Sequence, residues 1–76
     1  MFVRLEKINP EERQMRFYVL YATQNLFGEW CLIREWGRIG SKGGQSKVDY
    51  AESLEAALKA LDRLRQQKLK RGYQLA

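Results

Sequence analysis

The residues with the clearest capacity for chemistry are two arginines and a tryptophan at alternate positions, Arg34, Trp36 and Arg38. Successive side chains of a β-strand point to opposite faces, so in a strand these three share one face. A base or sugar stacks on an indole and arginine binds phosphate bidentately, so the set suits a nucleotide. The alternative is a core tryptophan with the arginines layered on its ring. The outward arrangement requires the opposite face, with Cys31 and Ile33, to pack inward.

The composition argues against enzyme chemistry. The chain has no histidine and a single cysteine, which removes Cys/His zinc sites, Ser-His-Asp and Cys-His nucleophile arrangements and any internal disulfide. Its nine acidic residues are scattered without the spacing of metal ligands or of an acid–base pair. We therefore predict no catalytic residue, no metal and no cofactor, and do not expect an enzyme.

The size and the residue usage predict one small domain over residues 1–76. Apolar residues make up 45% of the chain and aromatic ones 12%, which favours a compact fold over disorder. No apolar run is long enough for a membrane helix, and the first residues do not have the pattern of a leader. The unpaired Cys31 fits a reducing compartment. We therefore expect a cytoplasmic protein without membrane contact.

The net charge of +5 favours a polyanionic partner, and it is concentrated near the end of the chain. The segment from Lys59 to Arg71 carries six basic residues and one acidic residue, which accounts for the whole net excess. Cations at a helix C-terminus also complement the helix dipole, so a solvated helix end explains the same pattern. Charge location alone does not identify a ligand.

Hydrophobic alternation and turn residues predict four antiparallel strands. The first ends at the turn dipeptide Asn9-Pro10, and the glycines between the third and the fourth permit a tight return. The predicted strands are Phe2–Ile8, Gln14–Gln24, Glu29–Ile39 and Gln45–Tyr50.

After Tyr50 the apolar period changes to that of a helix, with leucines and an alanine recurring along one face. Ser53 is placed as the N-cap, and Gly72 is placed where a left-handed C-terminal cap is expected. The remaining residues, from Tyr73 to Ala76, are predicted to form a short tail. The fold class is therefore α+β, a small antiparallel sheet with one C-terminal helix packed on one face.

The run Arg34-Glu35-Trp36-Gly37-Arg38-Ile39-Gly40, the following Gly44-Gln45 and a helix ending Lys68-Leu69-Lys70-Arg71-Gly72-Tyr73 resemble the WGR domain. This domain is named for its Trp-Gly-Arg tripeptide and occurs in poly(ADP-ribose) polymerases and in small bacterial proteins. The resemblance covers nearly the whole chain, and the ending looks most like the stand-alone bacterial members.

In the polymerases the domain is a DNA-binding module that engages a strand break, and by position the resemblance implies that Trp36 packs against the terminal nucleotide and that Arg38 lies near the DNA end and neighbouring domains. Gly37 matches the motif glycine, whose missing side chain permits a close approach. Gln45 also matches the family pattern. The polymerase members continue beyond the position of Tyr73 with segments that help hold the terminal phosphate, so break-specific binding is not implied for this chain.

We therefore predict a nucleic-acid-binding module, with DNA favoured, in which Trp36 stacks on a terminal or unpaired nucleotide. Arg34, Arg38, Lys42 and Lys47 are predicted to contact phosphates. The alternative is a protein-interaction domain anchored by the same strand, because Trp and Arg dominate interface hot spots. A free edge strand in so small a sheet also favours a homodimer.

Overall fold

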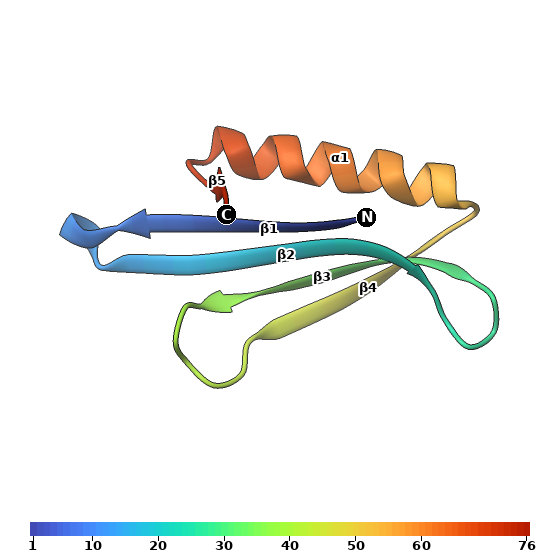
Figure 1. The fold of residues 1–76 in the computed structure, drawn as a ribbon, viewed down its shortest axis with the longest axis horizontal. Coiled ribbons are helices and arrows are strands. Elements are labelled where there is room, and N and C mark those ends of the chain that lie inside the picture. The colour runs from blue at the N-terminus through green and yellow to red at the C-terminus, as the bar shows by residue number, and fades with distance from the viewer.

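A computed structural model describes all residues from Met1 to Ala76, and it contains one antiparallel sheet and one long helix. Figure 1 shows the helix running along the strands as a second layer. In chain order the elements are β1 (Phe2–Asn9), the 3₁₀-helix η1 (Pro10–Glu12), β2 (Gln14–Gln24), β3 (Trp30–Arg38), β4 (Gln45–Ala51), α1 (Leu54–Lys70) and β5 (Gln74–Leu75). The predicted α+β class is confirmed.

The sheet has the order β4-β3-β2-β1-β5, with all neighbours antiparallel. The four predicted strands are present with ends that differ by at most one residue. β5 is an addition, because the predicted tail pairs with the outer side of β1, Gln74 opposite Glu6 and Leu75 opposite Leu5. Two residues carry too little pattern to predict a strand, and the pairing arises because the helix returns the chain to that edge.

Both predicted caps of the helix are confirmed. The Ser53 hydroxyl accepts a hydrogen bond from the Ala56 N–H at 3.0 Å. At the other end Gly72 has a φ of +94°, and the N–H groups of Gly72 and Tyr73 bond to the carbonyls of Leu69 and Lys68 at 3.2 and 3.1 Å. This is the Schellman arrangement, which turns the chain sharply back toward β1.

The core lies between α1 and the face of the sheet that carries the even-numbered residues of β3. It consists of the buried side chains Val3, Leu5, Tyr18, Leu20, Leu32 and Leu61. The expectation that the odd-numbered face of β3 packs against the helix is therefore wrong. Trp36 points to the same side as the helix and packs against the core cluster, while remaining partly exposed. The reason is collective, because β1 contributes Val3 and Leu5 and β2 contributes Tyr18 and Leu20 to this side, where they pack with the helix.

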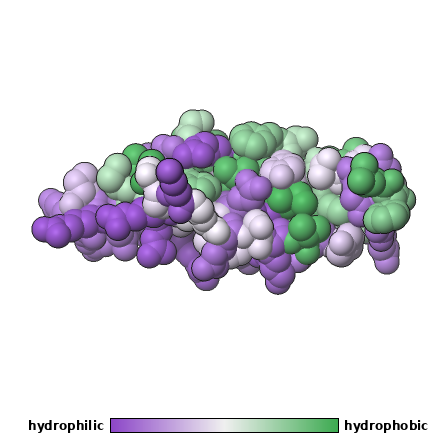
Figure 2. Space-filling view, turned by 90° about the horizontal axis from the view of Figure 1, so that it is seen from below, coloured by the Kyte–Doolittle hydropathy of each residue, from purple (hydrophilic) through white to green (hydrophobic).

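The opposite face of the sheet is open and partly apolar. Phe2 and Tyr21 stack there with ring centroids 6.0 Å apart, and Val48 and Tyr50 are exposed on β4. Figure 2 shows hydrophilic residues gathered toward the end of the molecule that carries η1 and the β3–β4 turn, with hydrophobic ones more frequent toward the other end. The helix α1 does not have the length and apolar character that a membrane-spanning helix requires.

Candidate nucleic-acid interface

Trp36 lies near the end of β3, where it forms part of an aromatic cluster beside the last turn of α1. Its ring stacks on that of Tyr18, the cross-strand neighbour in β2, with centroids 5.6 Å apart and an angle of 11° between the planes. Tyr73 meets Tyr18 edge-on at 6.3 Å. One side of the indole is therefore fixed by packing, which holds the ring in a defined orientation.

Gly37 and Gly44 allow β3 and the start of β4 to approach closely beside this ring. A Cβ at Gly37 would lie 3.2 Å from the Phe17 ring and 3.3 Å from the Gly44 Cα. A Cβ at Gly44 would lie 2.7 Å from the carbonyl oxygen of Trp36. The close approach that the sequence suggested for Gly37 is therefore present, and Gly44 is the more tightly constrained of the two.

A pocket of about 510 Å³ opens between the β1–β2 turn and the start of β4. Arg13, at the C-terminal end of η1, has a φ of +55°, a left-handed conformation that costs free energy for a residue other than glycine. The pocket is lined by Glu12, Arg13, Gln14, Met15, Arg16, Trp36, Gly37, Arg38, Gly44 and Gln45. The structure thus brings Trp36, Gly37, Arg38 and Gln45 together around one opening.

Three basic residues form a row across the sheet next to Trp36. The register places Lys7 of β1 opposite Arg16 of β2, and Arg16 opposite Arg38 of β3, all on the face that carries the helix. None of the three forms an ion pair within the chain. Like charges directly opposite each other destabilise a sheet, so the row favours an anion that neutralises it.

The basic surface continues to the end of the helix through a second pocket of about 250 Å³. Its lining residues are Lys7, Gln14, Arg16, Lys68, Arg71 and Tyr73, and it shares Gln14 and Arg16 with the first pocket. Lys68 lies over the Tyr18 ring, with Nζ 4.3 Å from the centroid. Burial, and then the neighbouring charges of Arg71 and Arg34, lower the pKa of Lys68 below its ordinary 10.5. A bound anion would raise the pKa of Lys68, because a nearby negative charge favours the protonated form.

The other residues predicted to contact phosphate lie apart from these pockets. The Arg34 side chain is only 18% exposed, and its Nε lies 3.0 Å from Oδ2 of Asp49. Lys47 Nζ lies 3.9 Å from the other oxygen of the same carboxylate. Lys42 is exposed in the β3–β4 turn and lines none of the pockets. Asp49 therefore neutralises part of the positive charge on this strand pair.

Sequence reasoning missed Lys7 and Arg16 as members of the basic surface. Strand alternation places each on the same face as the buried Leu5 or Tyr18, and the short Asn9–Pro10 turn limits the register of the hairpin. Pairing the two strands in this register therefore indicates that Lys7 and Arg16 lie side by side. Neither strand indicates this when it is considered alone.

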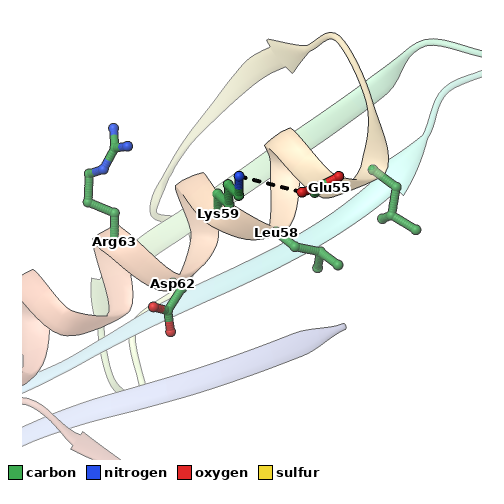
Figure 3. Close-up of a pocket in the computed structure, with 6 residues that line it drawn as sticks. Glu55, Leu58, Lys59, Asp62 and Arg63 are labelled. Atoms are coloured by element: carbon green, nitrogen blue, oxygen red, sulfur yellow. Dashed lines mark ion pairs between the residues drawn. The ribbon is translucent and has the colours of Figure 1, made fainter.

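The largest surface depression, about 650 Å³, lies along α1 and has a different character. Figure 3 shows Lys59 directed toward Glu55, with which it pairs at 3.4 Å, and Asp62 and Arg63 on the next turn. Its two basic and two acidic side chains balance, so this surface offers no net attraction to an anion. Its acidic residues do not belong to any cluster that could hold a metal ion.

Comparison with known proteins shows which family this sequence matches. The model of the WGR domain family matches residues 1–76. An uncharacterized protein, y4dW, of Sinorhizobium fredii (strain NBRC 101917 / NGR234) is 42% identical over 69 residues, which cover 91% of this chain and 33% of that protein. The chain thus spans about a third of the length of this relative. No solved structure gives a significant match.

Proposed function

Because the chain belongs to the WGR domain family, we propose that it binds nucleic acid, with DNA favoured, at the surface around Trp36. In this proposal Trp36 packs against a terminal or unpaired nucleotide, while Arg16, Arg38 and Lys7 contact phosphates. Lys68 and Arg71, which share a pocket with Lys7 and Arg16, extend this phosphate-contacting surface from the helix end. Gln45, which lines the same pocket as Trp36, is assigned a polar contact to the nucleotide.

The observation that carries the proposal is the unpaired row Lys7–Arg16–Arg38 beside a partly exposed tryptophan. Phosphates supply the negative charge that the row lacks, and each arginine can donate hydrogen bonds to a phosphate with two N–H groups. The stack on Tyr18 occupies one side of the indole, so a nucleotide would meet its remaining exposed surface. An end, a nick or a single strand offers such a nucleotide, whereas the interior of a duplex does not.

The contacts of Arg34 and Arg38 support different roles for the two residues. Arg34 is largely covered and pairs with Asp49, whereas Arg38 is exposed and has no acidic partner. We therefore assign Arg38 to the nucleic acid and Arg34 to holding β4 against β3. The same reasoning gives Lys47 a secondary role, since it lies within ion-pair distance of Asp49.

The proposal is tested by replacing each of the two tryptophans of β3 with leucine. Trp36→Leu is expected to raise the Kd for blunt, nicked or single-stranded oligonucleotides about tenfold, since stacking on an aromatic ring contributes about 1–3 kcal/mol per base. Trp30→Leu is the matched control, because Trp30 lies on the same face at the far end of the strand. The measurement is fluorescence anisotropy of labelled oligonucleotides, with and without a 5′ phosphate.

The same titrations at two or more salt concentrations report the phosphate contacts. The log–log slope of the binding constant against salt is expected to be about −0.7 to −0.9 for each phosphate neutralised. A slope of zero, or equal losses from the two tryptophan variants, would contradict the proposal.

Lys68→Gln is expected to separate binding from stability. Affinity should fall about tenfold with the loss of one charged phosphate contact. In the free protein, the unfolded chain binds more protons than the folded one between the lowered pKa of Lys68 in the folded state and its ordinary pKa of 10.5, so Lys68 makes stability rise with pH in that window. Urea denaturation at several alkaline pH values should show a weaker rise in the variant. An equal rise in both proteins, or an unchanged Kd, would contradict the assignment.

A further inference from the structure

One edge of the sheet is partly covered by a short strand, and the other edge is free. At one edge β5 covers part of β1, and the Ala76 N–H bonds to the Arg4 carbonyl at 3.0 Å. At the other edge β4 pairs with β3 on one side only, over the seven residues Gln45–Ala51. Figure 1 shows no element beyond β4. A long strand with unpaired backbone groups is a template for pairing with another chain.

The register fixes which backbone groups of β4 point outward. The Ile39 N–H bonds to the Met15 carbonyl at 2.8 Å, so the odd-numbered residues of β3 bond to β2 and the even-numbered ones bond to β4. The partners of those even residues include Lys47 and Asp49, whose backbone groups therefore point inward. The backbone N–H and C=O groups of Ser46, Val48 and Tyr50 face away from the sheet.

The side chains of this edge are self-complementary. In an antiparallel pairing centred on Val48, Lys47 of one copy lies opposite Asp49 of the other, and the reverse pair repeats the contact. These are non-hydrogen-bonded positions, where opposing side chains approach most closely. On the open face Val48 meets its own copy, and Ser46 meets Tyr50, which is 68% exposed in the single chain. An edge lysine without an acidic partner would oppose association, but in this pairing Lys47 lies opposite Asp49 of the other copy.

We propose that a second copy of this chain pairs with the β4 edge, antiparallel and centred on Val48, to form a two-fold symmetric dimer with a continuous sheet. The backbone pairs are Val48 with Val48, and Ser46 with Tyr50 of the second copy. The two-fold axis is perpendicular to the sheet, so both helix-bearing faces lie on the same side. The proposal is independent of nucleic-acid binding.

The experiment is sedimentation equilibrium of the full chain in the absence of nucleic acid, from low micromolar to millimolar concentration. The wild type is expected to show a concentration-dependent monomer–dimer equilibrium. Val48→Pro removes an outward N–H at the centre of the pairing, and proline is tolerated where that N–H faces solvent, so the monomer should still fold. The dimer Kd of this variant is expected to rise at least about tenfold. Circular dichroism confirms its fold.

A charge exchange between two variants tests the register. Lys47→Glu and Asp49→Lys each place like charges opposite each other in both halves of their own dimer, and each alone is expected to raise the dimer Kd about tenfold. Mixed in equal amounts, they restore opposite charges in both halves, so a heterodimer should form with near wild-type affinity. Circular dichroism also checks the fold of Asp49→Lys, because this variant loses its ion pair with Arg34. A wild type that stays monomeric, a Val48→Pro variant that dimerises normally, or a mixture of the two folded charge variants without heterodimer would overturn the proposal.

Discussion

Arg16→Glu is expected to weaken nucleic-acid binding about a hundredfold while stabilising the free protein. Arg16 is the central member of the basic row and lies opposite both Lys7 and Arg38. Loss of a charged phosphate contact corresponds to about 1.5–3 kcal/mol, and the introduced carboxylate also repels the phosphates. In the free protein both cross-strand pairs become attractive, at about 0.2–1 kcal/mol each. The two effects have opposite signs, which a variant that merely unfolds cannot produce.

The matched control is Arg63→Glu, which changes the net charge equally. Arg63 is exposed on α1 beside the charge-balanced depression of Figure 3. Its effect is expected to be limited to long-range attraction, a loss of about threefold or less at physiological salt. The measurements are anisotropy titrations and urea denaturation of both variants. The salt slope should become shallower by about one unit for Arg16→Glu and not for the control. Similar losses for the two variants would remove Arg16 from the interface.

Gly44→Ala is expected to be the most destabilising of the glycine substitutions, at about 2–3 kcal/mol. Its Cβ would lie 2.7 Å from the backbone oxygen of Trp36, an atom that cannot move without shifting β3 or β4. Gly37→Ala should cost less, because its nearest neighbours, the Phe17 ring at 3.2 Å and the Gly44 Cα at 3.3 Å, leave the new Cβ more room than the 2.7 Å at Gly44. Gly40→Ala meets no atom within 4 Å but has a φ of +85°, so its cost is backbone strain alone, about 1 kcal/mol.

Urea denaturation of the three variants measures this order. Because the displaced backbone carries Trp36, Gly44→Ala should also lower nucleic-acid affinity even under conditions where the protein is fully folded. A Gly44→Ala protein as stable as the Gly40→Ala protein would show that the two strands separate easily at this point. The structural role assigned to Gly44 would then be wrong.

The local elements were readable from the sequence because each depends on neighbours in the chain. The leucine spacing with Ser53 and Gly72 predicted the helix and both of its caps. Alternation within one strand placed Arg34, Trp36 and Arg38 on a common face, as the register confirms. β5 had no such signal, because its two residues form a strand only through β1.

Which face of the sheet the helix covers was not determined by any single strand. β2 is apolar on both faces, with Tyr18 and Leu20 on one and Val19 on the other all buried. The choice follows from the summed apolar surface of Val3, Leu5 and the residues beside them, a quantity that exists only once the strands are paired. Trp36 therefore faces the helix side rather than the open side.

The sequence by itself determined the fold class, the helix with its caps and the grouping of the motif residues on one strand face, because short-range periodicity and cap chemistry fix these features. Only the tertiary structure decided that Lys7 and Arg16 lie in one row with Arg38, that Arg34 forms an ion pair with Asp49, and that β4 is the free edge of the sheet. Those relations depend on strand register and order, which bring together charges far apart in the chain. Electrostatic interactions act over distance in space, so the composition of this basic surface becomes visible only after folding.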